Sequence, residues 1–199
     1  MQKPAEIKYP VHSLIRERWS PRAFDDRPVE REKLLQLFEA ARWAASCFNE
    51  QPWRFIIATR EIPEVYQKLF DCMVEANQIW AKQAPVLMLS LAEKNFAYNQ
   101  KLNRHFMHDL GLAMGNFSLQ ATELGLFVHQ MAGFSTDKAR ENLKLPDDVE
   151  PAAMVAIGYA GDLDTLPEKL KTKELEPRVR KPISELVYQG EWGNPFIVP

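Results

Sequence analysis

One long amphipathic segment dominates the middle of this 199-residue sequence. From about Asn103 to Leu124, apolar side chains return every three or four residues, which is the spacing of one face of an α-helix. The members of this stripe are Phe106, Leu110, Ala113, Met114, Phe117, Ala121 and Leu124. Gly111 and Gly115 lie near the stripe, although glycine costs a helix about 1 kcal/mol relative to alanine. We therefore predict a central helix whose small residues let another backbone approach closely.

Strands and helices alternate irregularly on both sides of this segment. Short apolar and β-branched runs predict strands at 54–59, 85–91, 126–130 and 152–159. Helical spacing and start signals predict helices at 11–18, from 28 to about 45, from 62 to 77 or 80, and from 135 or 136 to 143. Long helices with a small, mostly antiparallel sheet predict an α+β fold.

The composition excludes several classes of protein. The net charge is −2, from 25 Lys and Arg against 27 Asp and Glu, so nothing attracts the chain generally to nucleic acid or to an anionic membrane. The sequence contains no run of 18 apolar residues, which is the length that a transmembrane helix needs. Cys47 and Cys72 form no zinc or redox motif, and we expect a buried free thiol at each, with a disulfide as the lesser alternative. We predict a cytoplasmic protein with no nucleic-acid or membrane partner, folded as one domain over 1–199.

The C-terminal part has a different character from the rest. Prolines interrupt it from Gly161 onward, and Arg178, Arg180 and Lys181 cluster within it. It offers little apolar material for a core of its own. We therefore expect residues from about 161 to 199 to form an extended arm that lies across another surface, with a second subunit as the candidate.

Two polar segments carry the residues best suited to a ligand. Arg18-Trp19-Ser20-Pro21-Arg22 offers guanidinium groups, which bind phosphate bidentately, beside a hydroxyl. Ala45-Ser46-Cys47-Phe48-Asn49-Glu50-Gln51-Pro52-Trp53 offers planar amides, which donate and accept along one edge. From composition alone, solvated charge and a helix-terminating loop are the ordinary explanations of these segments, and the arginines indicate only a weak anion site. A flat, anionic, hydrogen-bonding ligand would use both.

Together the two segments resemble the nitroreductase family of FMN enzymes. In that family an Arg-Arg-Ser-x-Arg segment precedes a Pro-Ser-Ser-x-Asn-x-Gln-Pro-Trp segment by about this spacing. The resemblance runs from about Ser13 to Gly193. It implies a nitroreductase-like α+β fold with a central, mostly antiparallel sheet flanked by helices. It also implies a homodimer in which the long helix lies at the interface and the FMN sites are shared between subunits.

The resemblance assigns FMN contacts to particular residues at the two ends of the chain. Arg18 and Ser20 match the residues on the phosphate side, and Arg22 matches the cation at the pyrimidine edge of the flavin ring. Trp19 stands where the family usually has a second arginine or a histidine. Arg178 and Arg180 match a basic pair that closes over the phosphate.

Further contacts are implied in the middle of the chain. Ala45, Ser46, Cys47 and Asn49 match a loop that reaches the flavin of the other subunit, with Ala45 and Cys47 replacing the commoner proline and serine. Asn77 matches an asparagine that contacts the ring. The segment Met131-Ala132-Gly133 matches the turn where a backbone N–H, at Ala132 or Gly133, points at flavin N5.

The resemblance implies an FMN-dependent oxidoreductase that uses NAD(P)H to reduce nitroaromatics, quinones or related small acceptors. Hydride passes through flavin N5 in a ping-pong sequence, so no catalytic side chain is predicted. Two alternatives stay open: a related flavin enzyme with dehalogenase or flavin-fragmenting chemistry, and a non-catalytic flavin- or anion-binding dimer. No metal is expected, because His105 and His108 lack a third ligand at a suitable spacing. Phe48, Trp80, Phe96 and Tyr98 are candidates for a substrate pocket, with core packing as their ordinary role.

Overall fold

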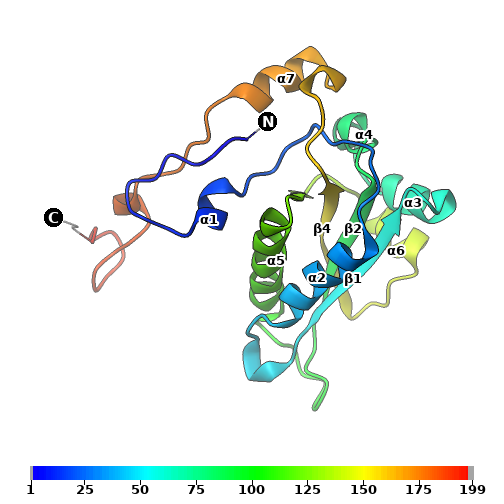
Figure 1. Cartoon of the computed structure of the whole chain (residues 1–199). Helices are drawn as coiled ribbons and strands as arrows, with labels where there is room; N and C mark the ends of the chain where they lie inside the picture. Colours follow the sequence, from blue (N-terminus) through cyan, green and yellow to red (C-terminus); the bar gives the residue numbers. More distant parts are fainter. Residues whose placement is uncertain (1, 197–199) are drawn as a thin grey trace.

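A four-stranded antiparallel sheet forms the centre of the computed structural model, which describes residues 2–196 (Figure 1). The strand order is β1-β2-β4-β3, with β1 at Trp53–Thr59, β2 at Val86–Glu93, β4 at Val149–Gly158 and β3 at Phe127–Met131. In β2, every residue except the last is buried, as expected for an apolar strand covered on both faces. The predicted α+β class is confirmed.

Helices cover both faces of this sheet. On one face, α2 (Arg31–Arg42) and α5 (Phe106–Glu123) pack Leu37 and Phe117 against the side chains of Met88 and Val155. On the other face lie α3 (Pro63–Phe70), α4 (Glu75–Ala81) and α6 (Thr136–Leu143). Alternate β2 residues point to opposite faces, so Leu87 and Leu89 join this second core. We call this layered unit the body.

The central helix predicted from the apolar stripe is confirmed as α5, whereas the close approach of another backbone to its glycines stays a prediction. Leu110, Ala113 and Phe117 are buried against the sheet. Gly111 and Gly115 lie on the exposed side, and a Cβ built on either would meet nothing within 4 Å. The small residues therefore leave an open strip along the helix and pack against nothing within residues 2–196.

The helix predicted from residue 62 to 77 or 80 is wrong, because the chain breaks it into α3 and α4. Between them, Met73 pairs with Phe134 in an isolated antiparallel bridge. Val74 donates its N–H to the Gly133 carbonyl at 3.1 Å. The helix is interrupted at residues 71–74, where Met73 and Val74 make these contacts and Val74 has extended backbone angles, although no glycine or proline marks the break.

The predicted C-terminal arm contains more regular structure than expected. After the short 3₁₀ turn η2 (Leu163–Thr165), residues Glu168–Leu175 form helix α7, and a second turn, η3 (Ile183–Glu185), follows later. The region from about 161 to 175 is therefore not an extended arm. Within residues 2–196, none of the helices is long and apolar enough to cross a bilayer.

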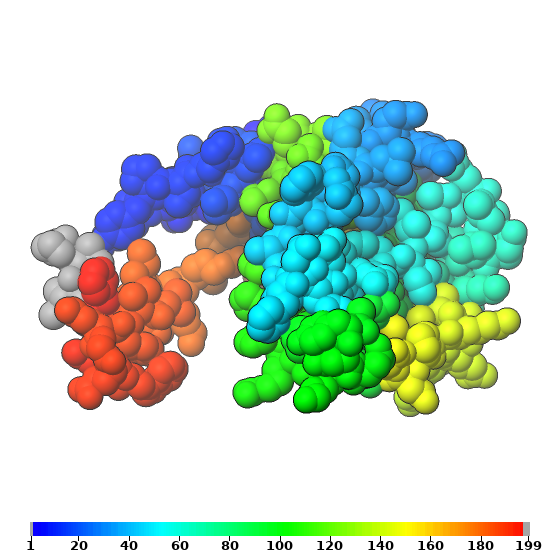
Figure 2. Space-filling view, turned by 90° about the horizontal axis from the view of Figure 1, so that it is seen from below, coloured from blue at the N-terminus to red at the C-terminus, as the bar shows by residue number. Residues whose placement is uncertain are grey.

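Two terminal segments, 2–18 with α1 (Ser13–Glu17) and 176–196, extend away from the body; we call them the terminal arms. Figure 2 shows an open space between the ends of these arms and the body. Arg178 ties the arms together, because its Nη1 donates to the carbonyls of Lys3 at 2.8 Å and Arg16 at 3.0 Å. Apolar side chains remain exposed on both arms, including Ile15, Val179 and Trp192.

Candidate functional site

A cationic cavity of about 190 Å³ lies where the terminal arms meet α7. Its lining comes from three parts of the chain that are far apart in sequence. The lining residues are Lys3, Arg18, Trp19, Ser20, Arg22, Lys173, Glu174, Arg178 and Arg180. Six of these side chains are cationic and one is acidic, so the cavity carries a large excess of positive charge. The structure thus brings together the arginine-serine segment and the C-terminal basic pair, as the sequence predicted.

Local contacts fix the segment that carries Arg18 and Arg22. The Pro21 carbonyl accepts a hydrogen bond from His129 Nδ1 at 2.8 Å. Two residues after Arg22, Phe24 pairs with Ala160 in an antiparallel bridge. Gly161 is required beside it, since a Cβ there would lie 2.3 Å from the Phe24 carbonyl carbon. The body therefore holds this segment at one end and leaves its side chains facing the cavity.

Three of the arginines crowd one another without an acidic partner. Burial lowers the pKa of Arg18, and the neighbouring Arg178 and Arg180 guanidinium groups lower it further. Burial lowers the pKa of Arg178 as well, with Arg180 adding to the effect. Among the described residues, no carboxylate lies within 4.0 Å of these three. Arg18 Nη1 instead donates to Ser20 Oγ at 3.3 Å. Such a cluster suits a multivalent anion such as a phosphate group.

Arg22 differs from the other three because it has an acidic partner. The buried carboxylate of Glu174, on α7, accepts from the Arg22 backbone N–H at 2.5 Å and from its Nη1 at 3.0 Å. Lys3 donates to the main-chain carbonyl of Glu174. Sequence reasoning missed Glu174, Lys3 and Lys173, because alternating charges on a short helix and a polar leading segment carry no distinctive signal.

A second group of predicted residues meets at the end of β3. Asn77 Nδ2 donates to the Gly133 carbonyl at 2.9 Å. A Cβ on Gly133 would lie 2.6 Å from Asn77 Nδ2, so the contact requires glycine. The Gly133 N–H finds no acceptor among the described residues, which leaves a backbone donor for a ligand. Ala132 is exposed, whereas the Met131 side chain is buried in the core and only its backbone remains for contact.

His129 connects this group to the cavity. Its ring lies 4.5 Å from the Trp80 ring, centroid to centroid, while its Nδ1 holds Pro21. Burial lowers the pKa of His129, so the neutral ring is favoured. Trp80 itself is buried and stacks on Phe24. Of the two roles considered for Trp80, the structure therefore supports core packing and not the lining of an open substrate pocket within this chain. Sequence reasoning noted His129 only as part of its strand.

The loop with Ala45, Ser46, Cys47 and Asn49 has a strained backbone. Phe48, Asn49 and Gln51 have φ angles of 52°, 58° and 54°, in the left-handed region that non-glycine residues rarely adopt. Side-chain acceptors help to hold this loop and its 3₁₀ turn η1 (Cys47–Asn49): the Cys47 N–H donates to Asp109 Oδ2, and the Gln51 N–H donates to Ser46 Oγ, each at 3.0 Å. Strain of this kind concentrates at functional sites.

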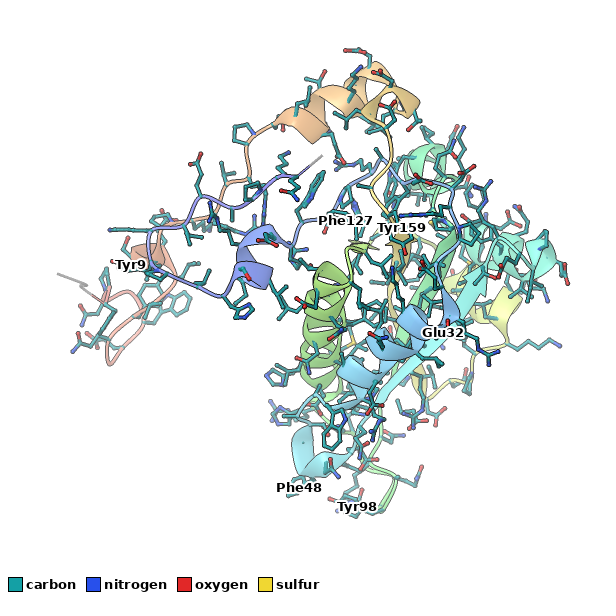
Figure 3. All side chains as sticks on the ribbon, in the orientation of Figure 1. Tyr9, Glu32, Phe48, Tyr98, Phe127 and Tyr159 are labelled. Atoms are coloured by element: carbon teal, nitrogen blue, oxygen red, sulfur yellow. The ribbon has the colours of Figure 1, made fainter. Side chains whose placement is uncertain are left out.

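This loop and the cavity lie at opposite ends of α5. Asp109, which holds Cys47, is in the first turn of the helix. Trp19 of the cavity wall packs edge-on against Phe127, which follows the last turn. Figure 3 shows Phe48 and Phe127 at these two ends. Since α5 has 18 residues, the ends are about 27 Å apart. One chain therefore does not unite the loop residues with the rest of the predicted site.

Solved structures with the same fold include proteins described by their cofactor or family. The crystal structure of an oxidoreductase described as containing FMN superposes with a TM-score of 0.90 at 35% identity, covering 96% of both chains. A nitroreductase family protein from Clostridium difficile 630 superposes with a TM-score of 0.69 at 30% identity, covering 89% of this chain and 96% of that one.

Sequence comparison gives the same result. The FMN reductase [NAD(P)H] of Bacillus subtilis is 28% identical over 163 residues, covering 72% of this chain and 63% of its own length. An uncharacterized 15.4 kDa protein of Mycolicibacterium smegmatis is 30% identical over 150 residues, which are 72% of this chain and 99% of the relative. The profile of the Nitroreductase family matches residues 15–159, from α1 to the end of the sheet. The resemblance drawn from the two polar segments is thereby confirmed, and the chain belongs to the nitroreductase family.

Proposed function

We propose that this protein is a homodimeric, FMN-dependent oxidoreductase that uses NAD(P)H to reduce nitroaromatics, quinones or related small acceptors. The observation that supports this most strongly is the cavity of about 190 Å³ with three arginines that lack an acidic partner among residues 2–196. Family membership supports the same function, since relatives include an FMN reductase and an oxidoreductase containing FMN.

The residues present suit FMN in charge and in hydrogen bonding. Arg18, Ser20, Arg178 and Arg180 would hold the phosphate, because guanidinium groups bind phosphate oxygens in pairs. Within residues 2–196, no carboxylate lies within 4.0 Å of the three guanidinium groups. Arg22 would face the pyrimidine edge of the flavin. A cation there favours the reduced flavin, which is the more negatively charged form.

The free backbone donor near β3 suits the opposite part of the flavin ring. The Gly133 N–H has no acceptor within residues 2–196, and Asn77 fixes the turn that carries it. When bound, FMN supplies hydride transfer through its N5 atom between NAD(P)H and the acceptor in alternating half-reactions. The chain's own contribution is to bind, orient and electrostatically tune that group.

The distance between the two ends of α5 supports a site shared between two copies. Ala45, Ser46, Cys47 and Asn49 are about 27 Å of helix away from the cavity of their own chain. A second copy that packs along the open strip of Gly111 and Gly115 would bring its loop to the cavity of the first. The exposed apolar side chains of the terminal arms would be covered in the same assembly.

The first experiment is the visible spectrum of the purified protein before and after anaerobic addition of NAD(P)H. Stoichiometric FMN that bleaches on reduction, followed by reoxidation with a quinone or nitroaromatic, is the expected result. A colourless protein that also fails to bind added FMN would overturn the proposal. Bound FMN without any turnover would leave a non-catalytic flavoprotein and would equally contradict it.

Two substitutions test the assigned contacts. Arg18→Ala should weaken FMN binding at least tenfold while leaving riboflavin binding nearly unchanged, because riboflavin has no phosphate. Arg16→Ala is the matched control, since Arg16 is exposed two residues away and does not line the cavity. Arg22→Ala should weaken FMN binding or lower the reduction potential of bound FMN. Unchanged values of both would remove the role assigned to Arg22.

A further inference from the structure

The acidic residue in the cationic cavity is the feature that the proposed function leaves unexplained. Glu174 is 2% exposed and is the one carboxylate among the residues that line the cavity. Burying a charge is costly unless it is paired and hydrogen-bonded. Its presence beside six cations, where the ligand is expected to be an anion, therefore calls for a specific role.

The hydrogen bonds of the Glu174 carboxylate are concentrated on Arg22. One carboxylate oxygen accepts from the Arg22 backbone N–H at 2.5 Å, and the other accepts from Arg22 Nη1 at 3.0 Å. The carboxylate thus fixes both the main chain and one edge of the guanidinium group. Among the described residues, Arg22 Nη2 and Nε have no hydrogen-bond partner. The outer edge of the guanidinium group is left for a ligand.

The charges point to a second effect of the same contact. Arg22 is the cation assigned to the pyrimidine edge, where negative charge increases when FMN is reduced. A carboxylate 3.0 Å from its Nη1 offsets part of that positive charge. The phosphate-side arginines have no such carboxylate neighbour in the part of the chain that the structure describes. The pocket therefore presents full positive charge to one end of the ligand and reduced positive charge to the other.

We propose that Glu174 is a positioning residue that aims Arg22 at the pyrimidine edge of FMN and lowers the reduction potential of the bound flavin. This inference rests on the proposed function. Helix α7 lies outside residues 15–159, which the family profile matches. The inference gives this helix a role in setting the reduction potential of the flavin, and hence the driving force for reduction of the acceptor.

The test compares the two-electron reduction potential of the FMN-loaded wild type with that of Glu174→Gln. Removal of the negative charge should favour binding of reduced over oxidised FMN about tenfold more than in the wild type. For a two-electron couple, that ratio is a shift of about 30 mV to more positive potential. Glu176→Gln removes the same charge from an exposed position two residues away and should leave the potential unchanged.

A double substitution shows whether Glu174 acts through Arg22. In an Arg22→Ala background, Glu174→Gln should shift the potential much less than in the wild type, because the group that it positions is gone. An equal shift in both backgrounds would overturn the proposal. Equal weakening of oxidised and reduced FMN binding by Glu174→Gln, with no change in potential, would mean a structural role only and would also overturn it.

A second variant keeps the test decisive if Glu174→Gln does not fold. Glu174→Asp keeps the charge and withdraws the carboxylate by one methylene group, so FMN should bind several-fold more weakly at nearly the wild-type potential. A wild-type affinity for FMN in this variant would contradict the aiming role. Failure of the proposed function is recognised separately, because the wild type itself would then bind no FMN or show no turnover with NAD(P)H.

Discussion

The body and the terminal arms use their apolar side chains in opposite ways. In the body, Leu37, Leu69 and Phe117 are completely buried between the sheet and its helices. On the arms, Val179 is 77% exposed and Trp192 is 88% exposed. The body completes its core within one chain, whereas the arms expose apolar surface that would be buried only against something else. The buried core that stabilises the chain and the largest exposed apolar side chains of the arms thus come from different parts of the same sequence.

The cavity depends on both parts. The segment that carries Arg18 and Arg22 is held to the body by the His129–Pro21 hydrogen bond. Arg178 and Arg180 line the same cavity from the C-terminal arm. A change in the body should therefore act first on unfolding, and a change in the arms should act first on association and on the ligand site. Four measurements test this division, beginning with the one for which we expect the largest effect.

Phe117→Ala should lower the free energy of unfolding by about 3–5 kcal/mol, because it leaves a cavity in a fully buried position between α5 and the sheet. Trp192→Ala, on the exposed arm, should change the unfolding free energy of the isolated chain by less than about 0.5 kcal/mol. Chemical denaturation at low protein concentration measures both. Similar losses in the two variants would break the distinction between body and arms.

Removal of residues 183–196 should weaken the proposed dimer at least 100-fold, or about 2.7 kcal/mol, since the deleted segment carries exposed apolar side chains and no residue of the cavity. Sedimentation equilibrium measures the association constant. Ile62→Ser is the control, because Ile62 is an exposed apolar residue at the start of α3, on the opposite face of the sheet from α5. Unchanged association after the deletion would show that the arm is not part of the interface.

Gly133→Ala should cost about 1–3 kcal/mol of unfolding free energy by overpacking, because the new Cβ would lie 2.6 Å from Asn77 Nδ2 and 3.0 Å from Val74 Cγ2. The same change should also weaken FMN binding, since it displaces the turn that carries the Gly133 N–H. Ala132→Ser, at the exposed neighbouring position, should have little effect on either quantity. Thermal unfolding and FMN titration of both variants check the prediction.

His129 should make the body sensitive to mild acid. Burial lowers the pKa of His129, and the nearby Arg22 lowers it further. The Pro21 carbonyl, the Glu174 carboxylate and the Ser20 backbone act in the opposite direction but do not cancel the effect of burial. The unfolded chain therefore binds a proton near pH 6.5 that the folded chain does not, and stability falls as the pH drops below about 6.5.

The steepest contribution of one such group is about 1.4 kcal/mol per pH unit. His129→Asn, whose amide can still donate to the Pro21 carbonyl, should flatten the dependence of unfolding free energy on pH between 6.5 and 5. Denaturation curves of both proteins across this range give the slopes. Identical slopes would show that His129 titrates alike in the folded and unfolded chains.

Sequence reasoning succeeded where the structure follows from local periodicity. The apolar run of β2 is buried as its pattern predicts, and the stripe of α5 is buried except at its ends, where Phe106 and Leu124 are half-buried. It failed where distant contacts decide, as at the bridge of Met73 with Phe134 that divides α3 from α4. Helix α7 was missed for a related reason, because the residue it buries is the charged Glu174, which no apolar pattern marks.

The candidate site divides in the same way. Arg18, Ser20, Arg22, Arg178 and Arg180 were identified by motif, and the structure gathers them in one cavity. The supporting contacts of Glu174 and His129 were not predicted, because each depends on the meeting of segments more than 100 residues apart. Motifs locate the groups that contact a ligand, whereas the groups that orient them emerge only from the tertiary fold.

The length of α5 has a consequence for inheritance. In the proposed pairing, each site takes its arginines from one subunit and its strained loop from the other. A mixed dimer with one subunit damaged at Arg18 and the other damaged in the loop at Asn49 would contain one site with both defects and one intact site. Two alleles of this gene broken at opposite ends of the helix would therefore complement each other, and two alleles broken at the same end would not.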